Sequence, residues 1–481
     1  MIWSRRQLGI AAVAAVAAVI LLFGWRNPMA LFIGILLSIT TISTVSSLLE
    51  YRWRTYTSNT PEAKRSIGFP KPVTKRPEEL TFFTVIVPAY HENSVLEHTL
   101  EVLARQNYPR DRYEVIVTLR DDDPETAAVA YRAAKRHQGL IMVRLGYYDA
   151  RHSNKPSQMN AVLKYAQGDY VVPFDAEDVV MPDLLRRVDA LIAQTGADVV
   201  QGGVQLTNLD NEMDGPWWRR AWQYVTNGWF AVHNVMEYRF WFSSRMFYQT
   251  KLGFVPLGGN TVFIRTDLLR QIDGWDIECL TEDADLGVRL SVEYGAKIVA
   301  AYDPELATRE HTPPCLTGKG SWLNQRIRWS QGFWQVLRRT PWYKLPTIRQ
   351  RAMALYILGT PLLQAFNAFV LPVAILAAFT MKAPVPFAML MFVPLIPMAL
   401  TMSVQLLELR PFSKDFNQQA KLLHYVSLVL GFLPYQIMLG LAATLAVVRE
   451  ARGVRTWSKT ARSEQIHLLQ TNHLSPEGGA A

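Results

Sequence analysis

Long uncharged apolar runs lie near both ends of this 481-residue chain and leave a mixed, charged stretch between them. Residues 8–24 and 29–49 carry no charged side chain, and each is about long enough to cross a hydrocarbon core of ~30 Å. Three further runs lie at about 353–379, 385–407 and 423–447. A chain with this pattern is predicted to fold as one soluble domain between two groups of membrane helices.

Charged residues around the first two runs indicate how these runs sit in a membrane. A cleaved signal peptide is the alternative for the first run, but the second run behind it favours a helical hairpin within residues 1–51. Lysines and arginines flank this hairpin on one side: Arg5, Arg6, Arg52, Arg54, Lys64 and Arg65. The positive-inside rule then places the soluble domain in the cytoplasm. We therefore expect an integral, multi-pass protein of the plasma membrane.

Two compositional features agree with this orientation. Cys279 and Cys315 are the two cysteines of the chain and are compatible with the reducing cytoplasmic side. The net charge of +9 sits largely beside the apolar runs. Anionic lipid headgroups are therefore the expected partner of the basic residues, rather than nucleic acid.

In the C-terminal membrane region, expected over residues 341–448, the number of apolar runs conflicts with the charge of the tail. Three spans that start in the cytoplasm would leave the tail outside the cell. Residues 449–481, however, begin with a basic segment, and the positive-inside rule keeps such a segment in the cytoplasm. One run is therefore expected to be re-entrant, interfacial or split at a proline. The candidate prolines are Pro361, Pro372 and Pro434. Beyond residue 463 the tail has low hydropathy, and we expect it to be disordered.

Between residues 81 and 340, after a linker at 52–80, short β-branched runs alternate with helical patterns. The expected strands are 82–88, 113–119, 139–144, 169–174 and 198–206, with helices such as 94–105 and 182–194 between them. This alternation predicts an α/β fold with a mostly parallel sheet. Ligands of such sheets collect at the carboxyl ends of the strands, so polar residues there are the first candidates for a site.

Acidic side chains follow the expected strands, and no GxGxxG or GxxxxGK[ST] loop does. A dinucleotide or P-loop site is therefore disfavoured. Asp175 follows the strand that ends near residue 174, and Glu177 comes two residues later. This spacing suits Mg²⁺ or Mn²⁺, which take oxygen ligands. The alternative is that Asp178 caps the helix expected at 182.

Two other segments offer groups for a nucleotide. Asp122 and Asp123 end the second strand, and a carboxylate there could accept the imide N–H of a uracil ring. A solvated turn fits the same residues. Lys155 could neutralise a diphosphate, although a surface lysine at a helix start is equally ordinary.

The segment from residue 256 to 290 combines glycines with a second acidic cluster. Gly258 and Gly259 allow close approach of the backbone to a bulky ligand. Thr281 could cap a helix whose first turn holds Glu282 and Asp283. A carboxylate in a closed site could instead act as a general base that removes a proton from an attacking hydroxyl.

Two tryptophan-rich segments, near 217–248 and 320–340, are candidate interfacial helices. On a helix, Gln325, Arg328 and Trp329 share one face. An interfacial helix and a sugar site both use such a face, because an indole covers a pyranose ring and an arginine binds diphosphate oxygens. Other aromatic residues of this segment are candidates for the bilayer surface or the packing beneath it: Trp322, Phe333 and Trp334. For 217–248 an interfacial amphipathic element is preferred over ordinary core.

Seven short motifs stand in order along the chain: PAYHE (88–92), LRDDDPET (119–126), NKPSQMN (154–160), FDAED (174–178), LGGN (257–260), LTEDADLGVRL (280–290) and QRIRW (325–329). This ordered set resembles glycosyltransferase family 2, in particular its membrane-embedded branch of cellulose, chitin, hyaluronan and poly-N-acetylglucosamine synthases. The resemblance spans about residues 82–340, and TED followed by QxxRW is its most specific part. It implies a nucleotide-sugar-binding domain of the GT-A type, flanked by transmembrane and interfacial helices.

On the donor side, the resemblance implies that Asp122 or Asp123 binds the uracil and that Lys155 lies near the nucleotide phosphates. Asp175 and Glu177 match the family's DxD motif and would hold Mg²⁺ or Mn²⁺ on the diphosphate. Arg328 of QxxRW would face the same diphosphate.

On the acceptor side, the resemblance implies that Asp283 of TED, with Glu282 beside it, deprotonates the acceptor hydroxyl. Trp329 and Gln325 of QxxRW would contact the acceptor sugar. Gly258 and Gly259 would lie beside that sugar.

The resemblance implies an inverting, metal-dependent hexosyltransferase that uses a UDP-sugar, with UDP-N-acetylglucosamine or UDP-glucose first. The expected product is a β-linked polysaccharide that is extended processively and exported. One alternative is a single addition to a lipid-linked or cell-envelope acceptor, and another is a catalytically silent membrane scaffold or transporter. Membrane lipids are expected partners, and an accessory export subunit is compatible with this function.

Overall fold

The computed structural model describes residues 41, 44–45, 79–146, 154–211, 213–380 and 395–455. The predicted N-terminal membrane hairpin and nearly all of the 52–80 linker lie outside the described residues. The same holds for the part of the tail that follows residue 455.

A seven-stranded sheet forms the centre of the soluble domain, in the order β3-β2-β1-β4-β7-β5-β8. All neighbouring strands are parallel except β7, which runs antiparallel to β4 and β5. The strands are β1 Phe83–Pro88, β2 Tyr113–Leu119, β3 Ile141–Leu145, β4 Tyr170–Pro173, β5 Val199–Gln201, β7 Val262–Arg265 and β8 Ile298–Ala300. The predicted mostly parallel α/β fold is thus confirmed.

The strand expected at 198–206 divides in two at Gly202. Its second half, β6 (Gly203–Leu206), leaves the main sheet and pairs in parallel with β9 (Ala307–Glu310). A Cβ atom at Gly202 would lie 2.7 Å from the backbone oxygen of Leu306. The glycine therefore permits the close backbone approach at which the chain changes sheets.

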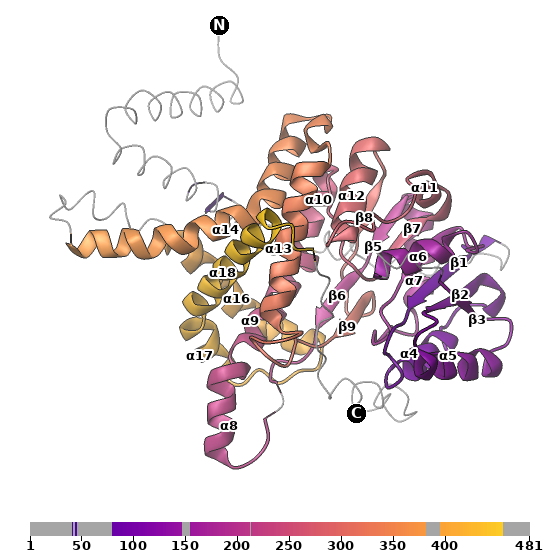
Figure 1. Cartoon of the computed structure of the whole chain (residues 1–481), viewed down its shortest axis with the longest axis horizontal. Helices are drawn as coiled ribbons and strands as arrows, with labels where there is room; N and C mark the ends of the chain where they lie inside the picture. The colour runs from indigo at the N-terminus through magenta and orange to yellow at the C-terminus, as the bar shows by residue number, and fades with distance from the viewer. Residues whose placement is uncertain are drawn as a thin grey trace, which may run out of the picture.

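Helices cover both faces of the large sheet (Figure 1), and the alternation of buried side chains along β1 agrees with this arrangement. Val85 packs in the core beneath α4, α5 and α7, whereas Ile86 packs in the core beneath α6, α11 and α12. The first three helices are α4 Leu96–Ala104, α5 Pro124–Arg136 and α7 Leu184–Thr195. The opposite three are α6 Lys155–Leu163, α11 Thr266–Gln271 and α12 Glu282–Glu293.

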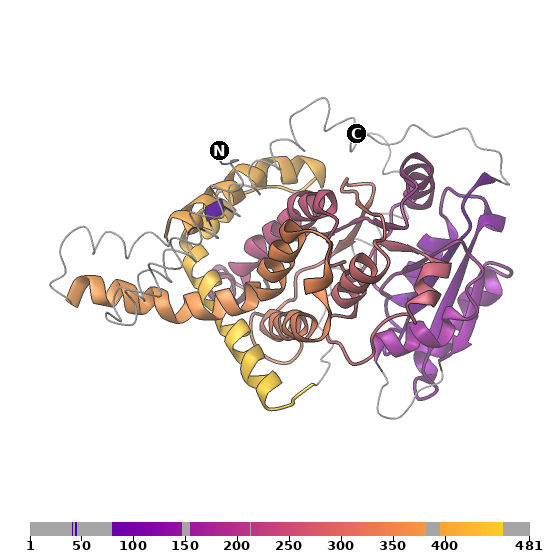
Figure 2. The same cartoon turned by 90° about the horizontal axis from the view of Figure 1, so that it is seen from above.

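The remaining helices form a second layer beside the sheet domain (Figures 1 and 2). They are α8 Trp217–Gln223, α9 Phe230–Phe240, α10 Met246–Leu252, α13 Trp322–Arg339, α14 Ile348–Thr380, α16 Leu395–Asp415, α17 Leu422–Leu430 and α18 Phe432–Ala451, with the π-helical turns η3 Tyr224–Gly228 and η4 Trp241–Arg245. In this layer α13 lies along α18. The Trp322 and Tyr435 rings are 5.0 Å apart near one end, and Gln335 donates to Glu450 over 2.9 Å near the other.

Two helices of the described chain are long and apolar enough to cross a membrane, Ile348–Phe369 and Phe432–Ala451. Within the run at 423–447 the helix breaks at Gly431, between α17 and α18. The number of spans in the C-terminal region stays a prediction. A Cβ at Gly431 would lie 2.7 Å from the Trp229 ring, so close packing accounts for the glycine. The prolines Pro361 and Pro372 stay inside the continuous helix α14.

The segment 217–248 also divides, and the prediction of one interfacial element is wrong for its second part. Helix α9 is core: Phe230, Val235 and Met236 are fully buried. By contrast, α8 buries none of its residues. The apolar side chains of α9 therefore serve tertiary packing, and α8 alone keeps an exposed aromatic surface.

Candidate active site

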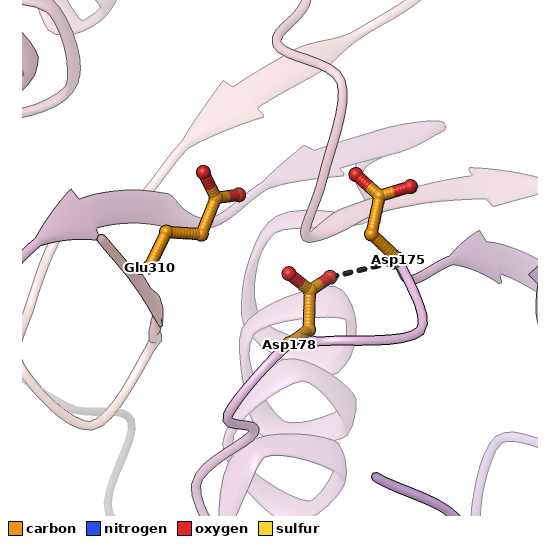
Figure 3. Close-up of side chains that lie close together, drawn as sticks. All are labelled: Asp175, Asp178 and Glu310. Carbon is orange, nitrogen blue, oxygen red and sulfur yellow. Dashed lines mark hydrogen bonds between the residues drawn. The ribbon is translucent and has the colours of Figure 1, made fainter. Parts of the chain in front are cut away.

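The carboxyl end of β4 leads into a turn that holds Asp175 and Asp178. The backbone N–H of Asp175 donates to Oδ2 of Asp178 over 2.7 Å. The predicted alternative, in which Asp178 caps the next helix, is wrong because α7 begins at Leu184 with Asp183 at its N-cap. The carboxylate of Asp178 instead points across the turn, toward Glu310 at the end of β9 (Figure 3).

Asp175, Asp178 and Glu310 together form a group that could hold a metal ion. One oxygen from each lies within 4.8 Å of the other two. Burial and the charge of Asp175 raise the pKa of Asp178 well above its ordinary value and that of Glu310 to about 7. Three crowded oxygen donors fit a divalent cation, because its charge would stabilise the ionised forms of Asp178 and Glu310.

The acidic group differs from the pair expected from the sequence. Asp175 belongs to it, but its other members are Asp178 and Glu310 rather than Glu177. The Nδ2 group of Asn260 donates to Asp178 over 3.1 Å and to Glu310 over 2.6 Å, so the LGGN segment holds the two acids together. Glu310 was missed because it comes from a strand of the second sheet and carries no recognisable motif.

Lys155 balances part of this negative charge, and its predicted role beside a diphosphate stays a prediction. Its Nζ lies 2.6 Å from Oδ1 of Asp175. Asn154 caps α6 by accepting from the N–H of Ser157 over 3.1 Å, which fixes Lys155 as the first residue of the helix. Burial alone would lower the pKa of Lys155, but the carboxylates of Asp175 and Glu282 raise it above its ordinary value.

The TED segment forms the start of α12, close to the same charges. Thr281 occupies the N-cap position, but its side chain accepts no capping hydrogen bond, so the predicted capping role is wrong. Burial and the neighbouring Asp283 raise the pKa of Glu282 to about 7. Burial also raises the pKa of Asp283, while the charges of Lys155 and Arg328 oppose the shift.

The predicted glycines bring backbone next to these acids. A Cβ at Gly259 would lie 3.2 Å from Oδ2 of Asp283. The N–H of Gly258 donates to Oε1 of Gln201 over 2.8 Å, and a Cβ there would lie 3.0 Å from the Phe242 ring. The LGGN segment thus connects the Asp178–Glu310 pair to the TED helix.

Helix α13 packs directly against the start of α12. A Cβ at Gly332 would lie 2.4 Å from Oγ1 of Thr281, so only a glycine fits this contact without displacement. Gln335 accepts from the N–H of Leu280 over 3.0 Å and donates to Glu450 of α18 over 2.9 Å. The QxxRW helix and the TED loop are therefore positioned as one unit.

The three QxxRW residues do not share one environment. The charge of Arg328 acts on Glu282 and Asp283, which places it near these two acids. Oε1 of Gln325 is buried without a hydrogen-bond partner among the described residues. Trp329 is partly buried, with its ring 5.9 Å from that of Tyr238.

The neighbouring aromatic residues of α13 serve packing. Trp322 is fully buried between Phe230 and Tyr435. The Phe333 ring lies 6.2 Å from the ring of Trp241. Trp322 and Phe333 are predicted either to lie at the bilayer surface or to pack beneath it, and the structure favours packing.

The two aspartates expected to bind uracil have local partners. Asp123 caps α5, since it accepts from the N–H of Thr126 over 3.2 Å and from the N–H of His91 over 2.5 Å. Asp122 is half exposed, and its pair with Arg120 over 2.6 Å lowers its pKa. Arg120 in turn lies 4.0 Å over the ring of Tyr90. A base-binding role for either aspartate stays a prediction.

Comparisons with known proteins bear on the fold and the family. A β-monoglucosyldiacylglycerol synthase from Trichormus variabilis is 27% identical over 257 residues, which cover 53% of this chain and 50% of that protein. A poly-β-1,6-N-acetyl-D-glucosamine synthase from Staphylococcus epidermidis is 22% identical over 285 residues, covering 58% of this chain and 61% of the other. The matched region is thus about half the length of the first of these curated relatives.

Among solved structures, a mannosyltransferase from Pyrobaculum calidifontis in complex with GDP-Man and Mn²⁺ has a TM-score of 0.50 and 20% identity. The match covers 84% of this chain and 99% of the other, and it supports the GT-A type of fold. The family model described as "Glycosyltransferase like family 2" matches residues 79–332, more than half of the 481 residues. On this match, the chain belongs to glycosyltransferase family 2.

Proposed function

We propose that this protein transfers a hexose from a UDP-sugar to an acceptor hydroxyl with inversion at the anomeric carbon. The observation that carries the proposal is the position of Asp283. It stands at the buried start of α12, beside Gly259, within reach of the charges of Lys155 and Arg328. A carboxylate whose pKa is raised by burial is better matched to accept a proton near neutral pH.

On the donor side, Asp122 or Asp123 would accept the imide N–H of uracil. Lys155 and Arg328 would face the diphosphate and stabilise the negative charge that develops on the departing UDP. Asp175, with Asp178 and Glu310 or the predicted Glu177, would hold Mg²⁺ or Mn²⁺. Such a cation supplies Lewis-acid stabilisation of the leaving diphosphate.

On the acceptor side, Trp329 would offer its ring to the acceptor sugar, and Gln325 would present its buried amide oxygen to a hydroxyl. An unpaired buried acceptor costs about 1–3 kcal/mol, which a ligand hydroxyl would recover. Gly258 and Gly259 would let the backbone approach the sugar. Asp283 would then take the proton of the attacking hydroxyl, with Glu282 as the adjacent acid.

For the acceptor, we propose the end of a growing β-linked polysaccharide that is extended processively and exported, with UDP-glucose or UDP-N-acetylglucosamine as donor. The likeness to the poly-β-1,6-N-acetyl-D-glucosamine synthase supports this acceptor. A second candidate is a single addition to a membrane lipid, which the higher identity to the β-monoglucosyldiacylglycerol synthase favours. For both candidates we propose that the enzyme lies at the plasma membrane, with its catalytic domain in the cytoplasm.

The test uses full-length protein in nanodiscs with Mg²⁺ or Mn²⁺ and a panel of nucleotide sugars. Release of UDP from one donor, with a product of inverted configuration, supports the proposal. If no donor is consumed with polymer and diacylglycerol acceptors supplied, the proposal fails. A ladder of product lengths identifies the polysaccharide acceptor, whereas one added sugar on lipid identifies the second candidate.

A further inference from the structure

Helix α8 exposes the most solvent-accessible tryptophans of the described chain. Trp217, Trp218 and Trp222 are 80%, 61% and 68% exposed, and Val225 in the following turn is 65% exposed. Large apolar side chains gathered in this way mark an interaction surface. We call these four residues the exposed aromatic surface of α8, and such a surface is expected to contact a partner molecule or a membrane.

Helix α8 is the exposed first part of a longer helical stretch. It continues through η3 into α9, since Gln223, Tyr224 and Trp229 all have helical backbone angles. None of the seven residues of α8 is buried, so no part of the described chain covers their side chains completely. In Figure 1, α8 projects away from the body of the molecule, below α17. Its side chains are therefore open to a surrounding medium or partner.

The charges of α8 indicate the chemistry of that partner. Trp218, Trp222 and Val225 recur at a spacing of four and three residues, which puts them on one side of the helix. Arg219 and Arg220 stand between them, and the helix contains no acidic residue. Exposed tryptophans interleaved with arginines are typical of helices at the headgroup level of a membrane, where indole rings and anionic phosphates meet.

The position of α8 favours a bilayer over a protein partner. The Tyr224 hydroxyl, directly after α8, lies 2.6 Å from the Ser427 hydroxyl of α17. Helix α17 exposes five apolar side chains, namely Leu422, Leu423, Val426, Val429 and Leu430. It leads into α18, a helix long and apolar enough to cross a membrane, whose Leu433 and Ile437 are also exposed. The apolar surface of α8 is thus linked to the exposed apolar side chains of α17 and α18.

We propose that α8 inserts its tryptophans into the headgroup region of a bilayer that contains anionic lipid. Arg219 and Arg220 bind the lipid phosphates, and Trp217, Trp218 and Trp222 reach the boundary between headgroups and acyl chains. The hydrogen bond from Tyr224 to Ser427 then fixes the soluble domain against the membrane beside α17. This inference is independent of the donor and of the reaction proposed above.

The test places an environment-sensitive fluorophore on α8 in full-length protein reconstituted in nanodiscs. Cys315→Ser removes the exposed thiol, and Cys279 is buried. Trp218→Cys then carries the label, with Trp222→Cys as a second site. Tyr131→Cys on α5, 54% exposed and far along the chain in the sheet domain, is the matched control. Lipids with brominated acyl chains serve as the quencher.

We expect a blue-shifted emission and strong quenching at positions 218 and 222, and neither effect at position 131. Replacing anionic by zwitterionic lipid should reduce the quenching, and Arg219→Gln with Arg220→Gln should remove this lipid dependence. Quenching at α8 equal to that at position 131 in both lipids would overturn the proposal. A blue-shifted emission without quenching by the brominated lipids, together with a concentration-dependent dimer in detergent, would also overturn the proposal. That result would show that the exposed aromatic surface of α8 binds a second copy of the protein.

Discussion

The guanidinium carbon of Arg326 lies 4.4 Å from the centre of the Trp329 ring. Arg326 occupies one of the variable positions of QxxRW and is 5% exposed. It donates to Oε1 of Glu237 over 3.1 Å, and Oε2 of Glu237 accepts from the Tyr435 hydroxyl over 2.6 Å. A chain of contacts therefore runs from α18 through α9 to the tryptophan expected to hold the acceptor.

The first prediction concerns Arg326→Lys, which keeps the charge but loses the planar guanidinium. A desolvated cation–π contact is worth about 1–2 kcal/mol, so we expect roughly a tenfold rise in acceptor KM with donor KM unchanged. Initial rates at varied acceptor and donor concentrations measure the two constants. Arg338→Lys is the control, since its guanidinium lies 5.9 Å from Trp334 and is mostly exposed. An equal effect of both substitutions would contradict a specific role for Arg326.

The sequence predicts a site residue well when the residues that it contacts lie in the same short segment, and poorly when they lie far away in the chain. TED and QxxRW are contiguous, so their helices and faces follow from local spacing. Glu310 and Arg326 are different, because Glu310 meets Asp175 and Asp178 from the turn after β4, and Arg326 meets Glu237 from α9. Only tertiary structure brings these groups together. Glu310 and Arg326 stand out because they are buried charged residues with charged partners, and burial cannot be read from the neighbouring sequence.

The apolar runs show the same limit. Hydropathy correctly identifies α14 and α18 as membrane-compatible helices, but it does not distinguish lipid from protein as the surroundings. Trp322 and α9 have the composition of an interfacial segment and yet are buried. Helix α18 covers Trp322 and Phe230, and helices α16 and α17 pack against the rest of α9. The seven residues of α8 have a similar composition and remain exposed.

A second prediction concerns the proposed base. Asp283→Asn should lower kcat by about 10²–10⁴-fold, the usual contribution of general base catalysis, while UDP binding is retained. Because the pKa of Asp283 is raised above 3.8, the acidic limb of the wild-type kcat/KM profile should lie above that pH. Asp267→Asn, at an exposed carboxylate paired with Arg265, should leave kcat unchanged. Turnover by Asp283→Asn at the wild-type rate would refute the assignment.

A third prediction distinguishes the two candidate ligand sets of the acidic group. Glu310→Gln removes a charge from the group of Asp175 and Asp178, so the Mn²⁺ concentration for half-maximal activity should rise about tenfold or more. Glu177→Gln should have a smaller effect, because Glu177 is outside this group. Direct Mn²⁺ titration by electron paramagnetic resonance provides a readout that does not require turnover. The reverse ranking would restore Glu177 as the ligand expected from the sequence.

A fourth prediction tests the contact between the QxxRW helix and the TED loop. Gly332→Ala would place a methyl group 2.4 Å from Oγ1 and 2.8 Å from Cβ of Thr281, so α12 must move. We expect a lower kcat and a loss of stability of about 1–3 kcal/mol, the usual cost of overpacking. Gly359→Ala, on α14 with no atom within 4 Å of the added carbon, is the control. Thermal unfolding and initial rates together measure both effects, and equal behaviour of the two variants would exclude the steric explanation.

The last prediction concerns pH and the packing of α9 on α17. His233 is fully buried, and its Nε2 lies 2.9 Å from the backbone carbonyl oxygen of Ser427. Burial lowers the pKa of His233 from 6.5 to about 4. In the unfolded chain this histidine is protonated below about pH 6.5, whereas in the folded protein it stays neutral down to about pH 4. The unfolded state therefore holds more protons between these two pH values. The neutral side chain contributes its full stability above pH 6.5, and this contribution falls as the pH drops toward 4.

Substituting His233→Gln keeps a donor for the Ser427 oxygen but removes the titration. We expect the melting temperature of the variant to fall less steeply than that of the wild type as the pH is lowered from 6.5 to 4, the window set by His233. Burial also lowers the pKa of His311 to about 4, so some pH dependence of the same sign should remain. His91→Gln, at an exposed histidine, is the control and should follow the wild type. Parallel curves for wild type and His233→Gln would show that this histidine does not link folding to pH.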